Sequence, residues 1–488
     1  MNLSKFYVNR YFLTLALSLS LFTASTTAQV KPIPTNNAPK TVATKQAVDV
    51  PFVNQVLPNG LEIIVLQDSS VPIVTVELAA RNGSFTEPPE LNGLSHLYEH
   101  MFFKTNGAIQ RLRERRALPS DNYLRDIGKL GITYNGSTRE EVVNYYFTTT
   151  SENARTAMNV VRDAAFEPAF DEGEFGREKL VVIGEIDRNE SNPFFYLSRA
   201  MSDKLFYKYP SRKNPLGNRE TVSTATTAKM RLIQNRYYVP NNCALVVTGD
   251  ITPEAAFTMA KELFGGWKRA DDPFKKFPLV EHPPLTQSEG EIIQQPVQNV
   301  IIQIGWQGPS IGKDDAATYA ADVFSFILQQ PDSRFQRKLV DSGLTAGVGF
   351  GYYTQRNVGP INLTVVTTPD KAKAALKAVY AELDAFNKPD YFTDVELENA
   401  KTLLATEDLQ SREKLSEYTH TLSFWWSSTG IDYFRGYQKN LRAISRGDIN
   451  RYISNYVNNK PHVGLALISP DAQKVANITP QDLIGELK

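Results

Sequence analysis

The chain has few of the residues that build several common kinds of metal or covalent site. It contains one cysteine, Cys243, which excludes an intramolecular disulfide and a zinc site made of several thiolates. Only five of its 488 residues are histidine, so any metal must be bound by a few imidazoles together with carboxylates. The 53 Lys and Arg balance 53 Asp and Glu, which argues against nucleic-acid binding, because such proteins usually carry a basic excess or stripe.

Long apolar runs are also missing. Beyond residue 28, no stretch approaches the roughly 20 apolar residues of a membrane helix. Lys5 and Arg10 precede a short apolar run at 11–23, and small residues follow it, which predicts a signal peptide over 1–28. An uncleaved membrane anchor is the alternative. From the predicted signal peptide we expect an exported chain with no membrane segment after cleavage. It would be periplasmic in a two-membrane bacterium and secreted otherwise.

The remaining sequence alternates strand-like and helix-like segments, as an α+β protein does. A polar, proline-containing leader at 29–50 precedes the first strand-like residues. Apolar runs with β-branched residues predict strands at 61–67, 73–80 and 142–149. Helical periodicity predicts helices over about 94–103 and from Asp171 onward, where Asp171 and Glu174 resemble a capping box.

The chain also contains two similar halves. A proline-rich linker is expected at 269–290, and the strand and helix pattern resumes after it. The segment YISNYVNNKPHVGLALISPD at 452–471 parallels LIQNRYYVPNNCALVVTGD at 232–250. This predicts two homologous mixed α/β domains of about 220 residues, at 51–268 and 291–488, although such weak similarity can also arise by chance.

One motif carries the chemistry. Residues 96–100 are His-Leu-Tyr-Glu-His, and on a helix His96 and His100 project from the same face, one turn apart. Two imidazoles at that spacing can bind one zinc ion, and Glu99 beside them can take a proton from water. A surface helix with incidental histidines is the alternative.

A catalytic zinc site needs a third protein ligand and one open position. Glu178 and Glu185 lie seven residues apart, two turns along one face of the helix expected from Asp171. We assign Glu185 as the third ligand and Glu178 as an acid that orients a ligand or tunes the local charge. Without the histidines, the same pair could be charged residues on a solvated helix face.

These motifs together resemble the pitrilysin/insulinase family of inverted-motif zinc peptidases, including mitochondrial processing peptidase-like subunits. The resemblance is carried by LPNGLEIIVL (57–66), GLSHLYEHMFFK (93–104), YNGSTREEVVNYY (134–146), EKLVVIGEIDRNESNP (178–193) and YYVPNNCALVVTGD (237–250). With the duplicated second half, it spans nearly all of the chain that follows the signal peptide.

The resemblance implies roles for individual residues. His96, His100 and Glu185 would hold one zinc ion per chain, Glu99 would be the general base, and Glu178 would support them. Asn135 resembles an asparagine on an edge strand where a substrate backbone can pair; the alternative is that Asn135 and Gly136 form only a turn. The segment at 107–129 looks like an insertion that could form a helix or lid.

The second half departs from the family pattern. Family members often carry an Arg followed seven residues later by a Tyr, but in SRFQRKLVDSGLTAGVGFG (333–351) Ala346 stands about where the Tyr is expected. The family's enzymes resemble clamshells of four such domains, so two domains make half of a clamshell. We therefore expect a homologous partner subunit that supplies the Arg and Tyr, in a heterodimer first and a homodimer second.

Three hypotheses follow. The first is an exported zinc metallopeptidase that hydrolyses peptides or unfolded small proteins. The second is a non-catalytic assembly or binding subunit that has kept the motif, since a fold alone does not decide function. The third is an exported binding protein with an accidental motif.

Overall fold

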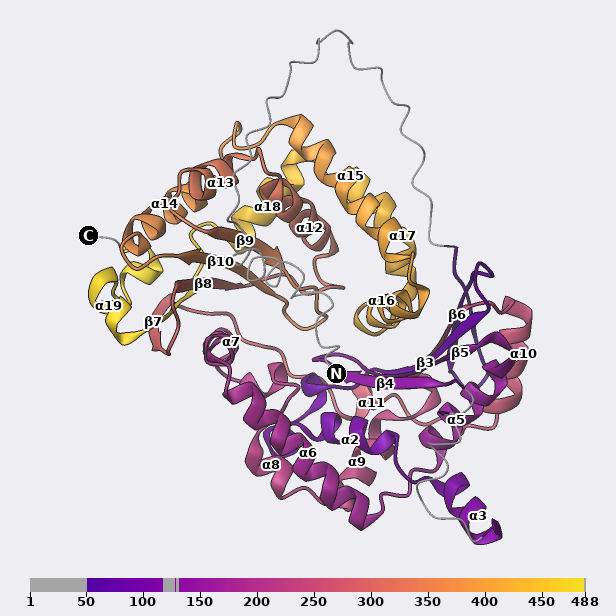
Figure 1. Cartoon of the computed structure of the whole chain (residues 1–488). Coiled ribbons are helices and arrows are strands. Elements are labelled where there is room, and N and C mark those ends of the chain that lie inside the picture. The colour runs from indigo at the N-terminus through magenta and orange to yellow at the C-terminus, as the bar shows by residue number, and fades with distance from the viewer. Residues whose placement is uncertain (1–50, 117–127, 129–130, 487–488) are drawn as a thin grey trace, which may run out of the picture. The chain divides into compact units, whose positions relative to one another are not determined.

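The structure is a computed structural model that describes residues 51–116, 128 and 131–486. Its strands form two sheets, one built from strands between residues 53 and 249 and the other from strands between residues 289 and 468 (Figure 1). The strands of the first sheet are β1 (Val53–Val56), β2 (Glu62–Gln67), β3 (Ile73–Ala80), β4 (Thr133–Thr138), β5 (Val143–Thr150) and β6 (Cys243–Gly249). Those of the second are β7 (Glu289–Gln294), β8 (Val300–Gln307), β9 (Gly347–Tyr352), β10 (Pro360–Thr367) and β11 (Val463–Ile468).

Helices follow most of the strands. In the first half they are α2 (Leu94–Phe102), α3 (Gly107–Arg116), α5 (Ala154–Phe166), α6 (Glu172–Glu190), α7 (Pro193–Leu205), α8 (Arg219–Ser223), α9 (Thr227–Tyr237), α10 (Pro253–Phe264) and α11 (Pro273–Lys276). In the second half they are α12 (Asp315–Gln329), α13 (Arg334–Gln336), the π-helical turn η6 (Arg337–Asp341), α14 (Ala372–Ala385), α15 (Asp394–Ser411), α16 (Leu415–Ser428), α17 (Ile431–Ala443), α18 (Arg446–Tyr456) and α19 (Pro470–Ala476). No helix in the described ranges is both long and apolar enough to cross a bilayer.

The two sheets share one topology. The first has the order β1-β2-β6-β3-β5-β4 and the second β7-β11-β8-β10-β9, so the second repeats the first without a counterpart of β1. In each sheet one pair is parallel, β2 with β6 and β7 with β11, and the other neighbours are antiparallel. The predicted similarity of 232–250 and 452–471 therefore falls on equivalent strands, β6 and β11. The predicted mixed α/β class is confirmed.

Alternation along the strands divides each sheet into two different faces. In β3, Val74, Val76 and Leu78 face a core built with α2, α5 and α10. The intervening Thr75, Glu77 and Ala79 point to the opposite face and are equally buried. In β8 of the second sheet, Ile302 and Ile301 likewise belong to two separate buried clusters, so each sheet is covered on both faces.

The two halves exchange helices to cover these second faces. Helix α16 of the second half packs on β3 and β6 of the first sheet, and α7 of the first half packs on β11 and β8 of the second (Figure 1). Leu197, Met201 and Leu205 of α7 form an apolar cluster with Ile301 and Leu465. This reciprocal packing joins the two halves into one unit from Pro51 onward.

Polar contacts also hold α16 against the first sheet. The hydroxyls of Thr419 and Thr248 lie 2.6 Å apart. The indole Nε1 of Trp426 donates to Glu62 at 2.8 Å, and the Arg81 guanidinium lies 4.1 Å from the centre of that indole ring. A cation over a buried aromatic ring adds to the packing energy of such a contact.

The start of α2 depends on a buried carboxylate. Glu87 accepts hydrogen bonds from the backbone N–H of Gly93 at 2.8 Å and of Ser95 at 2.5 Å, which helix geometry leaves unpaired. Gly93 has φ of +89°, and a Cβ there would lie 2.6 Å from the Cα of Gly217. Burial raises the pKa of Glu87 to about 7, against the opposing effect of these hydrogen bonds.

Replacing Glu87 by alanine should lower the free energy of unfolding by about 3 kcal/mol, because two buried N–H groups lose their acceptor. A urea titration followed by circular dichroism measures the change. The exposed Glu90 supplies the control, since Glu90→Ala should change stability by less than about 0.5 kcal/mol. Equal effects of the two variants would show that Glu87 does not anchor α2.

One sequence-based boundary differs from the structure. The segment predicted as a linker at 269–290 includes the short helix α11, and β7 begins at Glu289 within it. β7 pairs in parallel with β11, a partner too distant in the sequence for local composition to reveal. The helix predicted in the insertion is present as α3, whereas residues 117–127 and 129, like the predicted signal peptide and leader at 1–50, lie outside the described residues.

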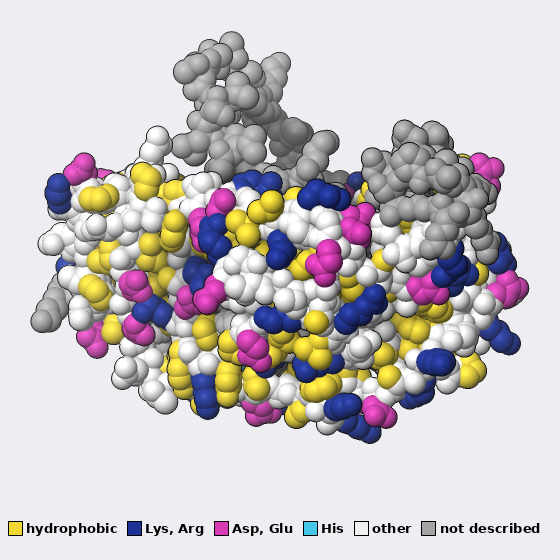
Figure 2. Space-filling view, turned by 90° about the horizontal axis from the view of Figure 1, so that it is seen from below, with side chains coloured by type: hydrophobic (Ala, Val, Ile, Leu, Met, Phe, Trp, Pro, Cys, Tyr) yellow, Lys and Arg dark blue, Asp and Glu magenta, His cyan; other side chains and the backbone are white. Residues whose placement is uncertain are grey.

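The surface of the described chain mixes both signs of charge. On the face seen from below, Lys and Arg side chains are interspersed with Asp and Glu and with small hydrophobic areas (Figure 2).

Candidate metal centre

Helix α2 presents both histidines of the motif on one side, as the spacing predicts. The ring centres of His96 and His100 lie 4.9 Å apart, in a nearly perpendicular arrangement. Residues on the opposite side of α2, including Leu97 and Met101, are buried in the core of the first half. The helix is therefore fixed by its apolar side while its imidazoles face α6.

Helix α6 brings Glu185 to these rings. Glu185 Oε2 lies 3.5 Å from His96 Nε2 and 3.8 Å from His100 Nε2. One ligand atom of each of the three residues lies within 4.8 Å of the others, and this is the group that qualifies as a metal site in the described ranges. The other oxygen, Oε1, lies 3.7 Å from the guanidinium of Arg188.

This donor set suits zinc. In a tetrahedral site with bonds of about 2.1 Å, neighbouring ligand atoms lie roughly 3.4 Å apart, close to the separations between Glu185 and the two rings. Two imidazole nitrogens and one carboxylate leave a fourth position for a reactant. Burial and the neighbouring His100 lower the pKa of His96 to about 3, so this ring is neutral and its nitrogen is available as a ligand.

Glu178 fixes the orientation of the second ring. It lies two turns before Glu185 on α6, and its Oε2 lies 3.1 Å from His100 Nδ1. Its other oxygen forms an ion pair of 2.6 Å with Lys104 Nζ. Burial would raise the pKa of Glu178, but the hydrogen bonds from His100 and Lys104 outweigh it and lower the pKa. An ionised Glu178 holds the His100 proton on Nδ1 and leaves Nε2 facing Glu185.

Replacing Glu178 by glutamine should weaken zinc affinity about 10- to 100-fold, the usual effect of losing a carboxylate that supports a ligand histidine. Competition with a fluorescent zinc chelator measures this. Glu174→Gln is the matched control, because Glu174 lies one turn earlier on α6 and contacts Thr105 instead of a histidine. Similar losses in both variants would contradict a specific role for Glu178.

Glu99 lies beside the ligand group and under strand β4. Its Oε2 accepts a hydrogen bond from the Thr138 hydroxyl at 3.0 Å, and Oε1 has no hydrogen-bond partner among the described residues. A Cβ on Gly136 would lie 2.8 Å from Oε1, so the glycine makes room for the carboxylate. Burial raises the pKa of Glu99 to about 7, opposed by His100 and the Thr138 hydrogen bond.

Asn135 lies on β4, which is the edge strand of the first sheet. It pairs with Tyr146 of β5, so the alternative that Asn135 and Gly136 form only a turn is wrong. Alternation places its side chain on the opposite face from Gly136 and Thr138, which contact Glu99. The structure therefore brings Asn135 to the strand beside the site and not into the ligand group.

Sequence reasoning missed three residues that shape the site. Lys104 follows α2 and holds Glu178, while Gly136 and Thr138 contact Glu99 from β4. Threonine is common in strands, so neither the residue type of Thr138 nor its spacing from the motif indicates a metal or catalytic site. The register of β4 against β5 places these two residues over Glu99, and that register comes from strand pairing across the sheet.

The second half contributes no Arg and Tyr pair from the stretch at 333–351. Ala346 stands where the family Tyr is expected, and its backbone N–H donates a hydrogen bond to the carbonyl of Val366. Arg334 is held by the buried Glu382, with 3.0 Å between Nε and Oε2. The hydroxyl of Tyr352 donates to the Pro309 carbonyl.

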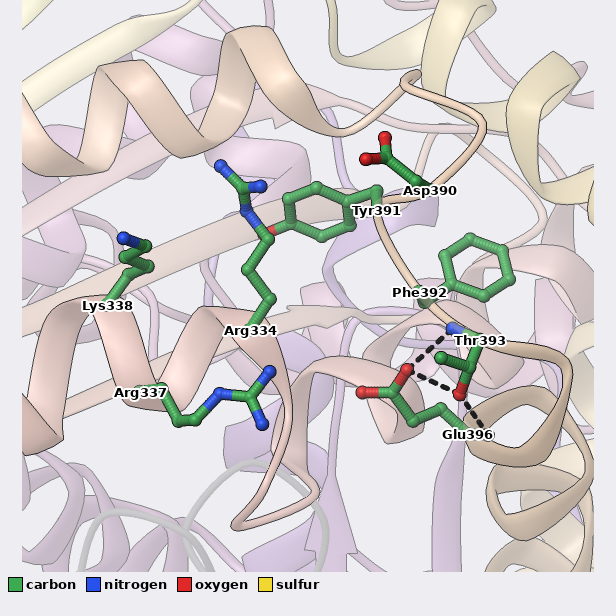
Figure 3. Close-up of a pocket in the computed structure, with 8 residues that line it drawn as sticks. All are labelled: Arg334, Arg337, Lys338, Asp390, Tyr391, Phe392, Thr393 and Glu396. Carbon is green, nitrogen blue, oxygen red and sulfur yellow. Dashed lines mark hydrogen bonds between the residues drawn. The ribbon is translucent and has the colours of Figure 1, made fainter.

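The basic residues of this stretch line a separate cavity of about 280 Å³ in the second half. Arg334, Arg337 and Lys338 lie on one side of it, and residues 390–393 with Glu396 lie on the other (Figure 3). Glu396 closes a capping box with Thr393 at the start of α15. None of the residues proposed for the metal centre lines this cavity.

The chain matches known sequence families over most of its described length. Residues 63–218 match the insulinase family, peptidase family M16, and residues 224–404 match the M16 inactive domain. The zinc protease PqqE of Helicobacter pylori is 22% identical over 406 residues, which cover 82% of this chain and 89% of that protein. The uncharacterized zinc protease YmxG of Bacillus subtilis is 26% identical over 345 residues, which cover 70% of this chain and 80% of that protein.

Solved structures share the same fold. A protease from Helicobacter pylori superposes with a TM-score of 0.77 at 19% identity and covers 87% of this chain and 100% of its own. The first half of the periplasmic protease PqqL from Escherichia coli superposes with a TM-score of 0.72 at 17% identity, covering 90% of this chain and 96% of its own. These similarities show that the chain shares the overall fold of these proteins.

Proposed function

Because this chain belongs to the pitrilysin/insulinase family, peptidase family M16, we propose that it is a zinc metallopeptidase that hydrolyses peptides and unfolded small proteins. The observation that carries the proposal is the convergence of His96, His100 and Glu185 beside Glu99. Two imidazole nitrogens, one carboxylate ligand and one further carboxylate are the groups that zinc-dependent hydrolysis requires.

His96, His100 and Glu185 would hold the ion. When bound, zinc acts as a Lewis acid that polarises a carbonyl and makes a water molecule more acidic. Glu99 takes a proton from water at Oε1 and later returns that proton to the leaving amine. Meanwhile the Thr138 hydroxyl keeps Oε2 in place. Glu178 keeps the His100 proton on Nδ1 throughout.

Strand β4 is the proposed binding edge for the substrate. One side of β4 pairs with β5 and the other has no partner strand in the described sheet. An extended peptide can add to such an edge through backbone hydrogen bonds. Its scissile bond would then lie close to Glu99, which Gly136 and Thr138 of β4 contact, and Asn135 would lie alongside the peptide.

We propose further that the chain acts with a homologous subunit. The family's Arg and Tyr are missing from the second half, so a related chain supplying them in a heterodimer is the first expectation and a homodimer the second. Export to the periplasm is also proposed, from the N-terminal pattern at 1–28. The periplasmic description of the related Escherichia coli structure supports it.

The test is to purify the full chain from its native host together with any bound subunit. Zinc content is measured by mass spectrometry, and cleavage of an unfolded casein peptide is followed with and without 1,10-phenanthroline. We expect one zinc per chain and cleavage that the chelator abolishes and added zinc restores. A complex that binds one zinc per chain but cleaves nothing supports the non-catalytic subunit, and a chain that binds no zinc refutes the metal centre.

A further inference from the structure

A buried carboxylate on the far face of the first sheet connects the two halves of the chain. Glu77 of β3 is fully buried, and its Oε2 lies 2.5 Å from Nδ1 of His420, on helix α16. Its Oε1 accepts a hydrogen bond of 2.7 Å from the side-chain amide of Asn144, on β5. A buried carboxylate is costly unless it is paired, so His420 and Asn144 together satisfy Glu77.

The chain of hydrogen bonds continues to the edge strand. The side-chain oxygen of Asn144 accepts from the hydroxyl of Ser137, on β4, at 2.6 Å. His420, Glu77, Asn144 and Ser137 therefore form one continuous series that begins on α16 and crosses β3 and β5 to β4. Its first two residues, His420 and Glu77, are 343 positions apart in the sequence.

The end of this series lies at the proposed active site. Ser137 stands between Gly136 and Thr138, the two residues of β4 that contact Glu99. β4 is paired on one side only, so its position depends on β5 and on side-chain contacts such as this one. A shift of Ser137 would move both the contacts with Glu99 and the free edge of the strand.

The same row of side chains includes a pair of contacting rings whose planes are tilted by 50°. The ring centres of Tyr146 and His420 lie 4.2 Å apart, and Tyr146 is paired directly with both Asn135 and Glu77 across the sheet. His420 thus contacts β5 by its ring and β3 by its Nδ1. Both contacts hold the strands on which β4 is built.

We propose that His420 is a positioning residue for the peptide-binding edge, acting from the second half through Glu77, Asn144 and Ser137 on strand β4. This inference rests on the proposed function only in that β4 receives the substrate. Without His420, Glu77 loses one of its two partners and must recruit water or turn away from Asn144. Ser137 is then less firmly held, and the edge binds an extended peptide more weakly.

The test is a double-mutant cycle between the two ends of the series. KM and kcat for an unfolded casein peptide are measured with the zinc-loaded full chain for His420→Ala, Ser137→Ala and the double variant. Peptide affinity is also measured by fluorescence anisotropy in the Glu99→Gln background, where cleavage is expected to be about a thousandfold slower. We expect each single variant to raise KM and the peptide Kd by about tenfold, the size of one buried hydrogen bond. The double variant should add little more, because both changes break one series.

Two further variants separate positioning from general stability. His420→Asn places an amide N–H near the former Nδ1 and should restore most of the affinity. Thr419→Ala removes a neighbouring contact of α16, to Thr248 of β6, which is not part of the series. Its effect should be smaller than that of His420→Ala, and additive with that of Ser137→Ala.

The proposal is overturned if His420→Ala and Ser137→Ala act additively, or if His420→Ala weakens peptide binding no more than Thr419→Ala does. It is also overturned if His420→Asn rescues nothing. A chain that binds the peptide with the expected coupling but cleaves none of it refutes the proposed peptidase activity and supports the positioning role. Failure of the two ideas can therefore be told apart.

Discussion

Replacing Glu99 by glutamine should lower kcat for an unfolded peptide by about a thousandfold, within the usual range for loss of a general base. Glutamine keeps the size of the side chain and can still accept the hydrogen bond from Thr138. It cannot take a proton from water at the pH of the reaction. Because Glu99 is not one of the three proposed metal ligands, zinc content should stay near one ion per chain.

Stopped assays with mass-spectrometric detection of products measure the change, and zinc content is determined on the same samples. Thr138→Val provides a milder companion, since it removes the hydroxyl that holds Oε2 and keeps the carboxylate. We expect it to lower kcat by about tenfold, as loss of a hydrogen bond to a charged group does. A Glu99→Gln variant that retains zinc and more than a tenth of the wild-type kcat would refute the assignment of the base.

The arrangement of the two histidines on α2 could be predicted because it depends only on local helix geometry. Four residues along a helix always place His96 and His100 on one side, whatever the rest of the chain does. Glu185 required one further step, which is that α6 must pack against α2. The seven-residue spacing of Glu178 and Glu185 indicated a common face, and the structure places both of them at the histidines.

The residues around Glu99 could not be predicted in the same way. Gly136 and Thr138 reach it only because β4 pairs with β5 in one register, and a shift of one residue would turn both away. His420 meets Glu77 only because α16 of the second half covers the first sheet. An apolar helix face indicates burial, but it does not say which sheet the helix will cover.

The fold shows the same division. The strands with long apolar runs, such as β2 and β3, were predicted almost to the residue. The first two residues of β7, Glu289 and Gly290, were assigned to a linker that contains four prolines and several charged residues, and the pairing of β7 with β11 is visible only in three dimensions. Patterns within a strand report burial, whereas strand order depends on partners far away in the chain.

Replacing His100 by alanine should reduce zinc from one ion per chain to less than about a tenth after dialysis, because two remaining protein ligands do not retain zinc against buffer. The loss should also appear as a loss of stabilisation. An ion that binds only the folded chain stabilises it by about 4 kcal/mol when free zinc is a thousandfold above its Kd. Thermal unfolding of the wild type should therefore shift upward on zinc addition, and that of His100→Ala should not.

His462→Gln is the matched control for this experiment. His462 is also partly buried, but it contacts Tyr380 and Ser288 in the second half and has no second histidine or carboxylate at metal-binding distance among the described residues. The His462→Gln variant should bind one zinc ion per chain, and its thermal unfolding should still shift upward on zinc addition. If the His100→Ala variant also bound one zinc ion and kept this shift, the ion would be held elsewhere. The approach of α2 to α6 would then have to be explained by the ion pairs of Glu178 and Glu185 alone.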